Sequence, residues 1–270
     1  MSFQVLNTSG YARRGELTTK TCAVQTPVFM PVGTYGTVKG LTPEHLHDIG
    51  FEIILGNAFH LHQRPGLETI KKFNGLHDFM GWNKSILTDS GGFQIWSLND
   101  LRKITEEGVE FKSPLDGSKI FMSPEDSIDT QLTLNSDIIM AFDECTDYPS
   151  SYEDAEQSMH LTHRWTERSL NYFQKHQKGH LLFGIVQGGM HEELRKQSLA
   201  FMNNLQLDGI ALGGLSVGEP KAEKTKILKY LAPMLPANKA HYVMGVGTPD
   251  ELVEGAVSYT HLRAHETLPY

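Results

Sequence analysis

Acidic, amide and glycine residues follow almost every short apolar run in the middle of this sequence. In ILTDSGGFQIWSL, Asp89 and Ser90 end an apolar run and are followed by Gly91 and Gly92. In SDIIMAFDE, Asp143 ends another such run. A carboxylate at a strand end can be aimed at a ligand, and glycines let backbone N–H groups approach that ligand. The other run ends carry Asn57, Glu144, Gln187 to Gly189, Gly213 with Gly214, and Gly245 with Gly247.

Two or three carboxylates around a polar pocket, without a metal-ligand spacing, suggest displacement at an activated carbon. Glycosyl transfer is the leading case, because one carboxylate attacks or stabilises an oxocarbenium-like centre while another moves protons. Asp and Gln side chains also present donor and acceptor edges that can bind the polar rim of a purine. For Asp89 a structural role is the alternative, since an Asp after a strand often N-caps the next helix.

Several other reactive residue types are interpreted as structural. Cys145 is expected to be a pocket or core thiol, because the sequence identifies no activating partner for it. His60 and His62 alternate along the chain, so they are predicted to face opposite sides. His160 and His163 are predicted to lie on an exposed helix. No GxGxxG or GxxxxGK[ST] loop is present, so a nucleotide cofactor has no support.

The elements that position these residues alternate between strand and helix. Near-continuous apolar runs suit strands buried on both faces, as in parallel sheets. Helices are predicted after Thr42-Pro43, Ser123-Pro124 and Thr248-Pro249, since a capping residue before proline marks a helix start. The alternation predicts a (β/α)8 barrel or, alternatively, a doubly wound sheet. The predicted strands span 27–34, 51–59, 85–92, 136–144, 181–189, 208–214 and 241–247. Two hairpin-like insertions are predicted, one over 3–25 and the other over 110–122.

The bulk properties set further limits. The 270 residues are 39% hydrophobic and 21% charged, with a net charge of −8, which argues against a broad nucleic-acid surface but allows a local basic patch. No apolar run is long enough for a membrane span and no secretory signal pattern is visible, so a cytoplasmic protein is expected. The two cysteines, Cys22 and Cys145, suit a reducing compartment.

Six motifs in order carry a family resemblance: LGNAFHL followed by RPG, TDSGGFQ, FDECT, FGIVQGG, GGLSVGEP and YVMGVGTP. They resemble the bacterial tRNA-guanine transglycosylases, collinearly from about residue 3 to about residue 256. The resemblance implies a (β/α)8 barrel with an N-terminal antiparallel cap and a late zinc-binding subdomain. It implies a glycosyltransferase (pentosyltransferase) of queuosine biosynthesis that exchanges guanine at the wobble position for preQ1, a 7-aminomethyl-7-deazaguanine. The implied partners are tRNAs for Asp, Asn, His and Tyr with GUN anticodons.

The resemblance also implies roles for individual residues. Asp89 would be the general acid/base, Asp143 would bind the guanine N1 and 2-amino edge, and Gln187 with the Gly214 N–H would hold O6. The Leu215 carbonyl would meet the 7-substituent, and the pair Cys145 and Val217 favours preQ1 over queuine. The implied base site also contains Ser90, Gly91, Gly92, Phe93, Gly213 and Met244, and the implied RNA-contacting segment is Gly245, Val246, Gly247, Thr248, Pro249, Asp250 and Glu251.

The sequence departs from the family pattern after LVEGA. Where the family has an FDCV-type strand with a nucleophilic aspartate, this chain reads VSYTHLRAHETLPY, and an ungapped count places Ala264 at the nucleophile position. We therefore expect residues 1–257 to form a truncated barrel domain and 258–270 a non-native tail. The last strand, last helix and zinc subdomain are expected to be missing, so no cofactor is expected in this chain. One structural zinc and a homodimer are expected only in a full-length member. The chain itself is expected to be inactive; a non-catalytic tRNA- or guanine-binding remnant and a barrel glycoside hydrolase are the alternatives.

Overall fold

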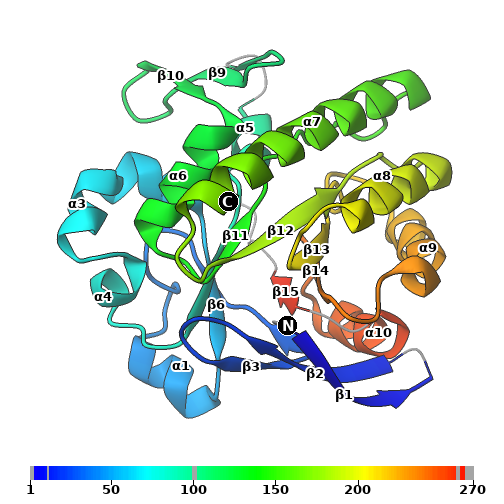
Figure 1. Ribbon diagram of the computed structural model, residues 1–270, viewed down its shortest axis with the longest axis horizontal. Coiled ribbons are helices and arrows are strands. Elements are labelled where there is room, and N and C mark those ends of the chain that lie inside the picture. Colours follow the sequence, from blue (N-terminus) through cyan, green and yellow to red (C-terminus); the bar gives the residue numbers. More distant parts are fainter. Residues whose placement is uncertain (1–2, 11, 99–101, 260–261, 265–270) are drawn as a thin grey trace.

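A curled parallel sheet forms the centre of the computed structural model, which describes residues 3–10, 12–98, 102–259 and 262–264 (Figure 1). Every strand pairing within this sheet is parallel. The spatial order is β4 (Val28–Phe29), β15 (Leu262–Ala264), β14 (Ala240–Met244), β13 (Gly209–Leu212), β12 (Leu181–Val186), β11 (Ile138–Met140), β7 (Ser85–Thr88), β6 (Ile53–Gly56) and β5 (Val32–Gly33). The predicted α/β class, an incomplete (β/α)8 barrel, is confirmed.

Closure of the sheet differs from the prediction in two details. The single strand expected at 27–34 is split, so that β4 pairs with β15 while β5 pairs with β6. The last barrel strand was expected to be missing, but β15 occupies its place between β14 and β4. Its pairing satisfies backbone groups on two sheet edges that would otherwise be unpaired, and this needs no apolar side-chain pattern. Of the predicted tail, residues 260, 261 and 265–270 lie outside the described residues, and so does the prediction of a missing last helix.

Helix starts follow the predicted capping signals. Thr42 and Ser123 each accept a hydrogen bond from the third residue of the helix they precede, in reciprocal capping boxes. A left-handed glycine, Gly50 with φ 90°, ends the first of these helices. The helices are α1 (Pro43–Ile49), α2 (Ala58–Leu61), a π-helical turn (His62–Gly66), α3 (Leu67–Lys72), α4 (Leu76–Met80), α5 (Gly92–Trp96), α6 (Pro124–Leu134), α7 (Tyr152–His176), α8 (Glu192–Asn204), α9 (Lys221–Leu231), a 3-10 turn (Ala232–Met234) and α10 (Pro249–Tyr259).

Two antiparallel sheets accompany the barrel, as predicted. The N-terminal one, β1 (Phe3–Ser9), β2 (Ala12–Thr18) and β3 (Ala23–Thr26), covers the end of the barrel where its strands begin. Its Phe3, Leu17 and Val24 belong to the same buried cluster as Phe183 and Tyr242 of the barrel strands. The other sheet consists of β8 (Arg102–Ile104), β9 (Val109–Lys112) and β10 (Lys119–Met122). The cap therefore closes one mouth of the barrel.

The prediction for His60 and His62 is wrong, and that for His160 and His163 is wrong for His163, whereas His160 is exposed as expected. Strand β6 ends at Gly56, so His60 and His62 lie in helical turns, where strand alternation does not apply. His163 is only 7% exposed, because α7 packs on α8: its ring stacks on Phe201 with centroids 4.0 Å apart. Burial lowers the pKa of His163 to about 4. This histidine is therefore a neutral core residue at neutral pH.

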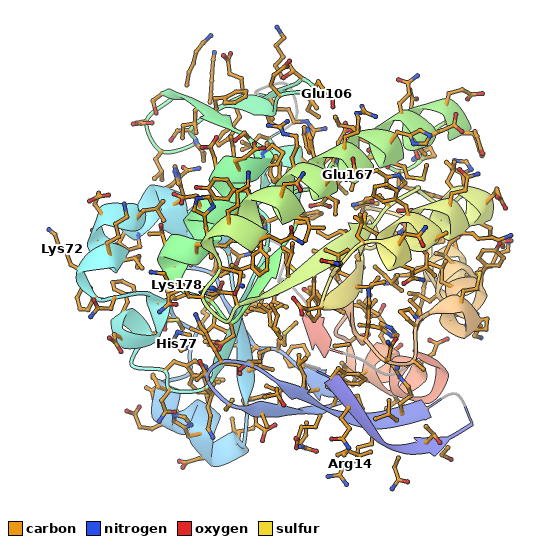
Figure 2. All side chains as sticks on the ribbon, viewed as in Figure 1. Arg14, Lys72, His77, Glu106, Glu167 and Lys178 are labelled. Atoms are coloured by element: carbon orange, nitrogen blue, oxygen red, sulfur yellow. The ribbon has the colours of Figure 1, made fainter. Side chains whose placement is uncertain are left out.

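Charged side chains occupy the outer surface. The labelled side chains of Arg14, Lys72, Glu167 and Lys178 are exposed and surround the ribbon (Figure 2). Among the described helices, none combines the length and the apolar character needed to cross a bilayer. The barrel strands are buried on both faces, and the charged side chains lie on the outer surface. Buried polar groups are therefore expected at the open mouth of the barrel.

Asp137 links the N-terminal cap to the barrel, and its side chain is fully buried. The carboxylate accepts hydrogen bonds from the Thr21 N–H at 3.0 Å and the Ile86 N–H at 2.8 Å, and contacts His77 Nε2 at 3.0 Å. We expect Asp137→Ala to lower the free energy of unfolding by about 3 kcal/mol, because it leaves buried donors without an acceptor. Urea unfolding would measure this, with Asp48→Ala on the exposed surface of α1 as control, expected to change stability by less than about 0.5 kcal/mol. Equal stabilities of the two variants would contradict this role.

Candidate active site

Asp89 lies directly after β7 and is 4% exposed. Its Oδ1 accepts a hydrogen bond from the Ala58 N–H at 2.8 Å, and its Oδ2 accepts from the side-chain amides of Gln94, at 2.9 Å, and Asn57. Helix α5 begins after Gly91 without a side-chain cap, so Asp89 does not cap the next helix. It is instead held by three donors at the mouth of the barrel, in a geometry suited to a fixed carboxylate that faces a ligand.

A second polar chain runs from Ser90 through Asp143 to Gln187. Ser90 Oγ donates to Asp143 Oδ1 at 2.8 Å, and Gln187 Nε2 donates to Asp143 Oδ2 at 2.8 Å. All three residues are buried, and they come from the ends of β7, β11 and β12. The prediction that parallel strands bring these ends together is therefore confirmed.

Two glycines permit this close packing. A Cβ on Gly92 would lie 2.5 Å from the Asp143 carbonyl oxygen and 2.7 Å from Asp143 Oδ1. Gly214 has φ +59°, and a Cβ there would lie 2.3 Å from Gln187 Oε1. Any larger residue at these positions would push the carboxylate or the amide away. A Cβ on Gly91, in contrast, would meet nothing nearer than Phe59 Cβ at 3.5 Å. Glycine is required at this position because its φ of +84° is left-handed.

Burial controls the titration of the site. Desolvation raises the pKa of Asp143, while hydrogen bonds from Ser90 and Gln187 oppose that rise. Burial also raises the pKa of the Cys145 thiol, and the neighbouring Asp143 carboxylate adds to the effect. A thiol of this kind stays protonated at neutral pH and is a poor nucleophile. This supports the interpretation of Cys145 as a pocket thiol.

Arg195 is a residue of this site that the sequence analysis did not identify. It lies on α8 and its side chain is fully buried. The guanidinium donates to four carbonyl oxygens: Val186 at 3.0 Å, Gly189 at 2.7 Å, Gly213 at 2.6 Å and Gly214 at 3.0 Å. These carbonyls belong to the last residue of β12 and to the segments after β12 and β13, so one side chain fixes both segments. In the sequence, Arg195 is one basic residue among several on an amphipathic helix, and only tertiary packing distinguishes it.

The segment after β13 supplies the remaining predicted pocket residues. Leu215 is 4% exposed, and Glu219 accepts the backbone N–H groups of Ser216 at 2.5 Å and Val217 at 2.8 Å. The end of β14 approaches the same mouth on the other side of Gly213, where an added Cβ would lie 3.5 Å from Met244 Sδ. Phe93 is half-buried on α5, with its ring centroid 5.1 Å from that of Trp96.

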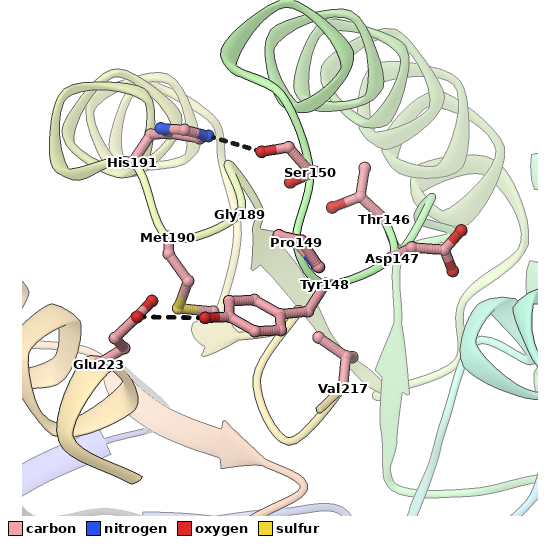
Figure 3. Close-up of a pocket in the computed structure, with 11 residues that line it drawn as sticks. Thr146, Asp147, Tyr148, Pro149, Ser150, Gly189, Met190, His191, Val217 and Glu223 are labelled. Atoms are coloured by element: carbon pink, nitrogen blue, oxygen red, sulfur yellow. Dashed lines mark hydrogen bonds between the residues drawn. The ribbon is translucent and has the colours of Figure 1, made fainter. Parts of the chain in front are cut away.

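A cavity of about 280 Å³ opens beside these residues. Figure 3 shows it between the loop after β11 and the start of α9, with Tyr148 spanning the space toward Glu223. The Tyr148 hydroxyl donates to Glu223 Oε1 at 3.1 Å. Gly214 and Val217 are among the residues that line it, whereas Cys145 lines a neighbouring, wider cavity of about 720 Å³. The two members of the predicted Cys145–Val217 pair therefore line different cavities.

The predicted RNA-contacting segment, 245–251, follows β14 and includes the first residues of α10. Thr248, Pro249 and Asp250 are exposed. The acidic residues here are paired: Asp250 with Lys221, and Glu251 with Lys224 at 2.6 Å between Oε1 and Nζ. Ser216 Oγ donates to the Gly245 carbonyl at 2.6 Å, which ties this segment to the loop after β13.

The sequence was also compared with known proteins. The family profile described as queuine tRNA-ribosyltransferase matches residues 8–258. The chain belongs to this family. The queuine tRNA-ribosyltransferase of Dechloromonas aromatica is 58% identical over 253 residues, which cover 94% of this chain and 69% of that protein. Those of Janthinobacterium sp. (strain Marseille) and Pseudomonas putida are 56% and 58% identical, covering 96% and 94% of this chain and 70% and 68% of theirs.

Family membership confirms the resemblance that the motifs indicated. Queuine tRNA-ribosyltransferases are pentosyltransferases, so the glycoside hydrolase alternative loses its support. A structural zinc is a possible feature of full-length members. Within the described part of this chain, no group of three or more His, Cys, Asp or Glu side chains could hold a metal ion. The described residues therefore do not fit that zinc.

The close approach at Gly92 can be tested by adding one methyl group. We expect Gly92→Ala to lower the free energy of unfolding by about 1–3 kcal/mol, because the new Cβ overlaps Asp143. Gly33→Ala is the matched control: Gly33 is also buried, yet a Cβ there meets nothing nearer than 3.4 Å. Urea unfolding of both variants would measure the difference. Wild-type stability of Gly92→Ala would show that the polar chain tolerates displacement.

Proposed function

We propose that the chain has the base site of a tRNA-guanine transglycosylase and that its mouth recognises guanine and preQ1 at the wobble position of tRNA. The observation that carries the proposal is the chain of hydrogen bonds from Ser90 through Asp143 to Gln187 beside the Gly214 N–H. A buried carboxylate next to amide and backbone donors complements the polar edge of a guanine. Family membership supports the same substrate class.

In the proposed complex, the polar groups of the base meet complementary donors and acceptors of the site. The Asp143 carboxylate accepts from N1–H and the 2-amino group, and the Gln187 amide and Gly214 N–H donate to O6. The Leu215 carbonyl accepts from the aminomethyl group of preQ1, while Phe93 and Met244 flank the base. The wobble nucleotide must leave the anticodon stack to reach these groups, as in other enzymes that act on a single base.

The transfer step needs one carboxylate to attack C1′ and another to move protons. Asp89, fixed by three donors, is proposed as the general acid/base. The proposed nucleophile position is Ala264, and it lies at the carboxyl end of β15, paired with Met244 of β14. Alanine cannot attack C1′, so the proposal for this chain is base recognition without exchange, which corresponds to the binding-remnant alternative.

The wider partners follow from the same proposal. The substrates are tRNAs for Asp, Asn, His and Tyr with GUN anticodons, and segment 245–251 is proposed to contact the RNA. A homodimer and one structural zinc are proposed for a full-length member of the family. The domain proposal remains a truncated family domain over 1–257 and a non-native tail over 258–270, although strand β15 of that tail pairs within the barrel sheet.

Base binding and base exchange can be measured separately on this chain. We expect calorimetry to detect binding of guanine and preQ1, and Asp143→Ala to weaken it about 30-fold, since a hydrogen bond to a charged group contributes about 2 kcal/mol. Incorporation of labelled guanine into unmodified tRNA with a GUN anticodon should be undetectable. The control is Asp48→Ala, which should bind like wild type. Absence of guanine binding would overturn the proposed function, and measurable exchange would overturn the role of position 264.

Binding should also depend on pH through Asp143. Its pKa is raised by burial, so the carboxylate form that accepts the base edge is lost at a higher pH than for an ordinary aspartate as the pH falls. Ser90→Ala removes a hydrogen bond that favours the charged form, so its pKa should rise further. We therefore expect the acid limb of guanine binding to move to higher pH in Ser90→Ala. An unchanged or lower midpoint in a calorimetric pH series would contradict this assignment.

A further inference from the structure

The Arg195 guanidinium is buried beneath the proposed base site, and no carboxylate of the described residues accepts a hydrogen bond from it, although the Glu219 carboxylate acts on it electrostatically. All of its hydrogen bonds go to backbone carbonyl oxygens. Burial lowers the pKa of Arg195 to about 10, which still leaves the group charged at neutral pH. Burying a full positive charge against neutral acceptors costs free energy that a merely structural contact does not require. This suggests that the charge itself has a use.

The peptide group between Gly213 and Gly214 connects the Arg195 guanidinium to the mouth of the barrel. Arg195 Nη1 donates to the Gly213 carbonyl at 2.6 Å, the shortest of its four bonds. In a trans peptide the C=O and N–H groups point in opposite directions, so fixing the Gly213 carbonyl aims the Gly214 N–H away from Arg195. That N–H donates to none of the described residues. A hydrogen bond to a carbonyl also polarises its peptide and strengthens the N–H as a donor.

We propose that Arg195 is a positioning residue for base recognition, which orients and strengthens the Gly214 N–H that holds the O6 oxygen of guanine. The inference rests on the proposed function and extends it to a residue that does not touch the base. Arg195 Nη2 and Nε hold the Gly214 and Gly189 carbonyls, so the whole segment around the donor is fixed. A Cβ on Gly214 would lie 3.2 Å from Arg195 Nη2, so glycine is needed for this approach as well.

A pair of ligands that differ only at position 6 of the purine tests the inference. Guanine has an oxygen there, whereas 6-thioguanine has a weakly accepting sulfur and keeps the N1–H and 2-amino groups that meet Asp143. We expect wild type to prefer guanine, and Arg195→Met, which keeps the stem but removes the charge, to reduce this preference about fivefold. Arg195→Lys keeps the charge but cannot reach four carbonyls, so its preference should be intermediate. Calorimetric dissociation constants for both ligands give the ratio.

The control variant and the outcomes that would contradict the inference are the following. Ser90→Ala acts through Asp143, so it should weaken both ligands by the same factor. Equal weakening of both ligands in the Arg195 variants would show a purely structural role and overturn the inference, as would unchanged binding. If both Arg195 variants unfold, the NMR resonance of the Gly214 amide proton in wild type provides the test. This resonance should shift more with guanine than with 6-thioguanine, and equal shifts would overturn the inference. If wild type binds neither ligand, the proposed function itself fails.

Discussion

Closure of a parallel sheet is the constraint on which the site depends. Because all strands of the barrel run in the same direction, their carboxyl ends meet at one mouth, while the N-terminal sheet covers the other end. The residue that follows each strand is therefore brought to the same place without any sequence proximity. Asp89, Asp143 and Gln187 are separated by more than forty residues each, yet hydrogen bonds connect two of them directly. The first strand, split into β4 and β5, completes the ring from both sides.

Bringing polar groups together in a buried mouth creates a second constraint, since each of them needs a partner. The site meets it with local bonds: Ser90 and Gln187 on Asp143, and Ala58 and Gln94 on Asp89. Each carboxylate accepts several donors, so both side chains have one defined orientation. Because both carboxylates are oriented before any ligand arrives, binding loses less free energy to ordering them.

Much of this arrangement could be predicted from the sequence, because local signals and global fold agree. The capping residues Thr42 and Ser123 marked helix starts, and apolar runs ending in Asp89 and Asp143 marked the strand ends that carry the site. The failures have physical causes. Strand β15 forms because neighbouring edges need partners, and a strand of three residues is too short for its side-chain pattern to predict it. The burial of His163 and Arg195 depends on how α7 and α8 pack, and helix periodicity alone does not show which polar residue faces the sheet.

The groups proposed for recognition and for transfer lie in different parts of this barrel, so a chain can keep the first without the second. The proposed base-binding groups follow β7, β11, β12 and β13, which are buried and mutually paired. The proposed nucleophile position belongs to β15, a three-residue strand held by backbone pairing with β14 and β4. Backbone pairing does not depend on the side chain, so alanine at position 264 can take part in the strand pairing as well as an aspartate could. The fold therefore imposes no penalty for losing the attacking group, whereas the loss of Asp143 or Arg195 would leave buried donors or acceptors unpaired.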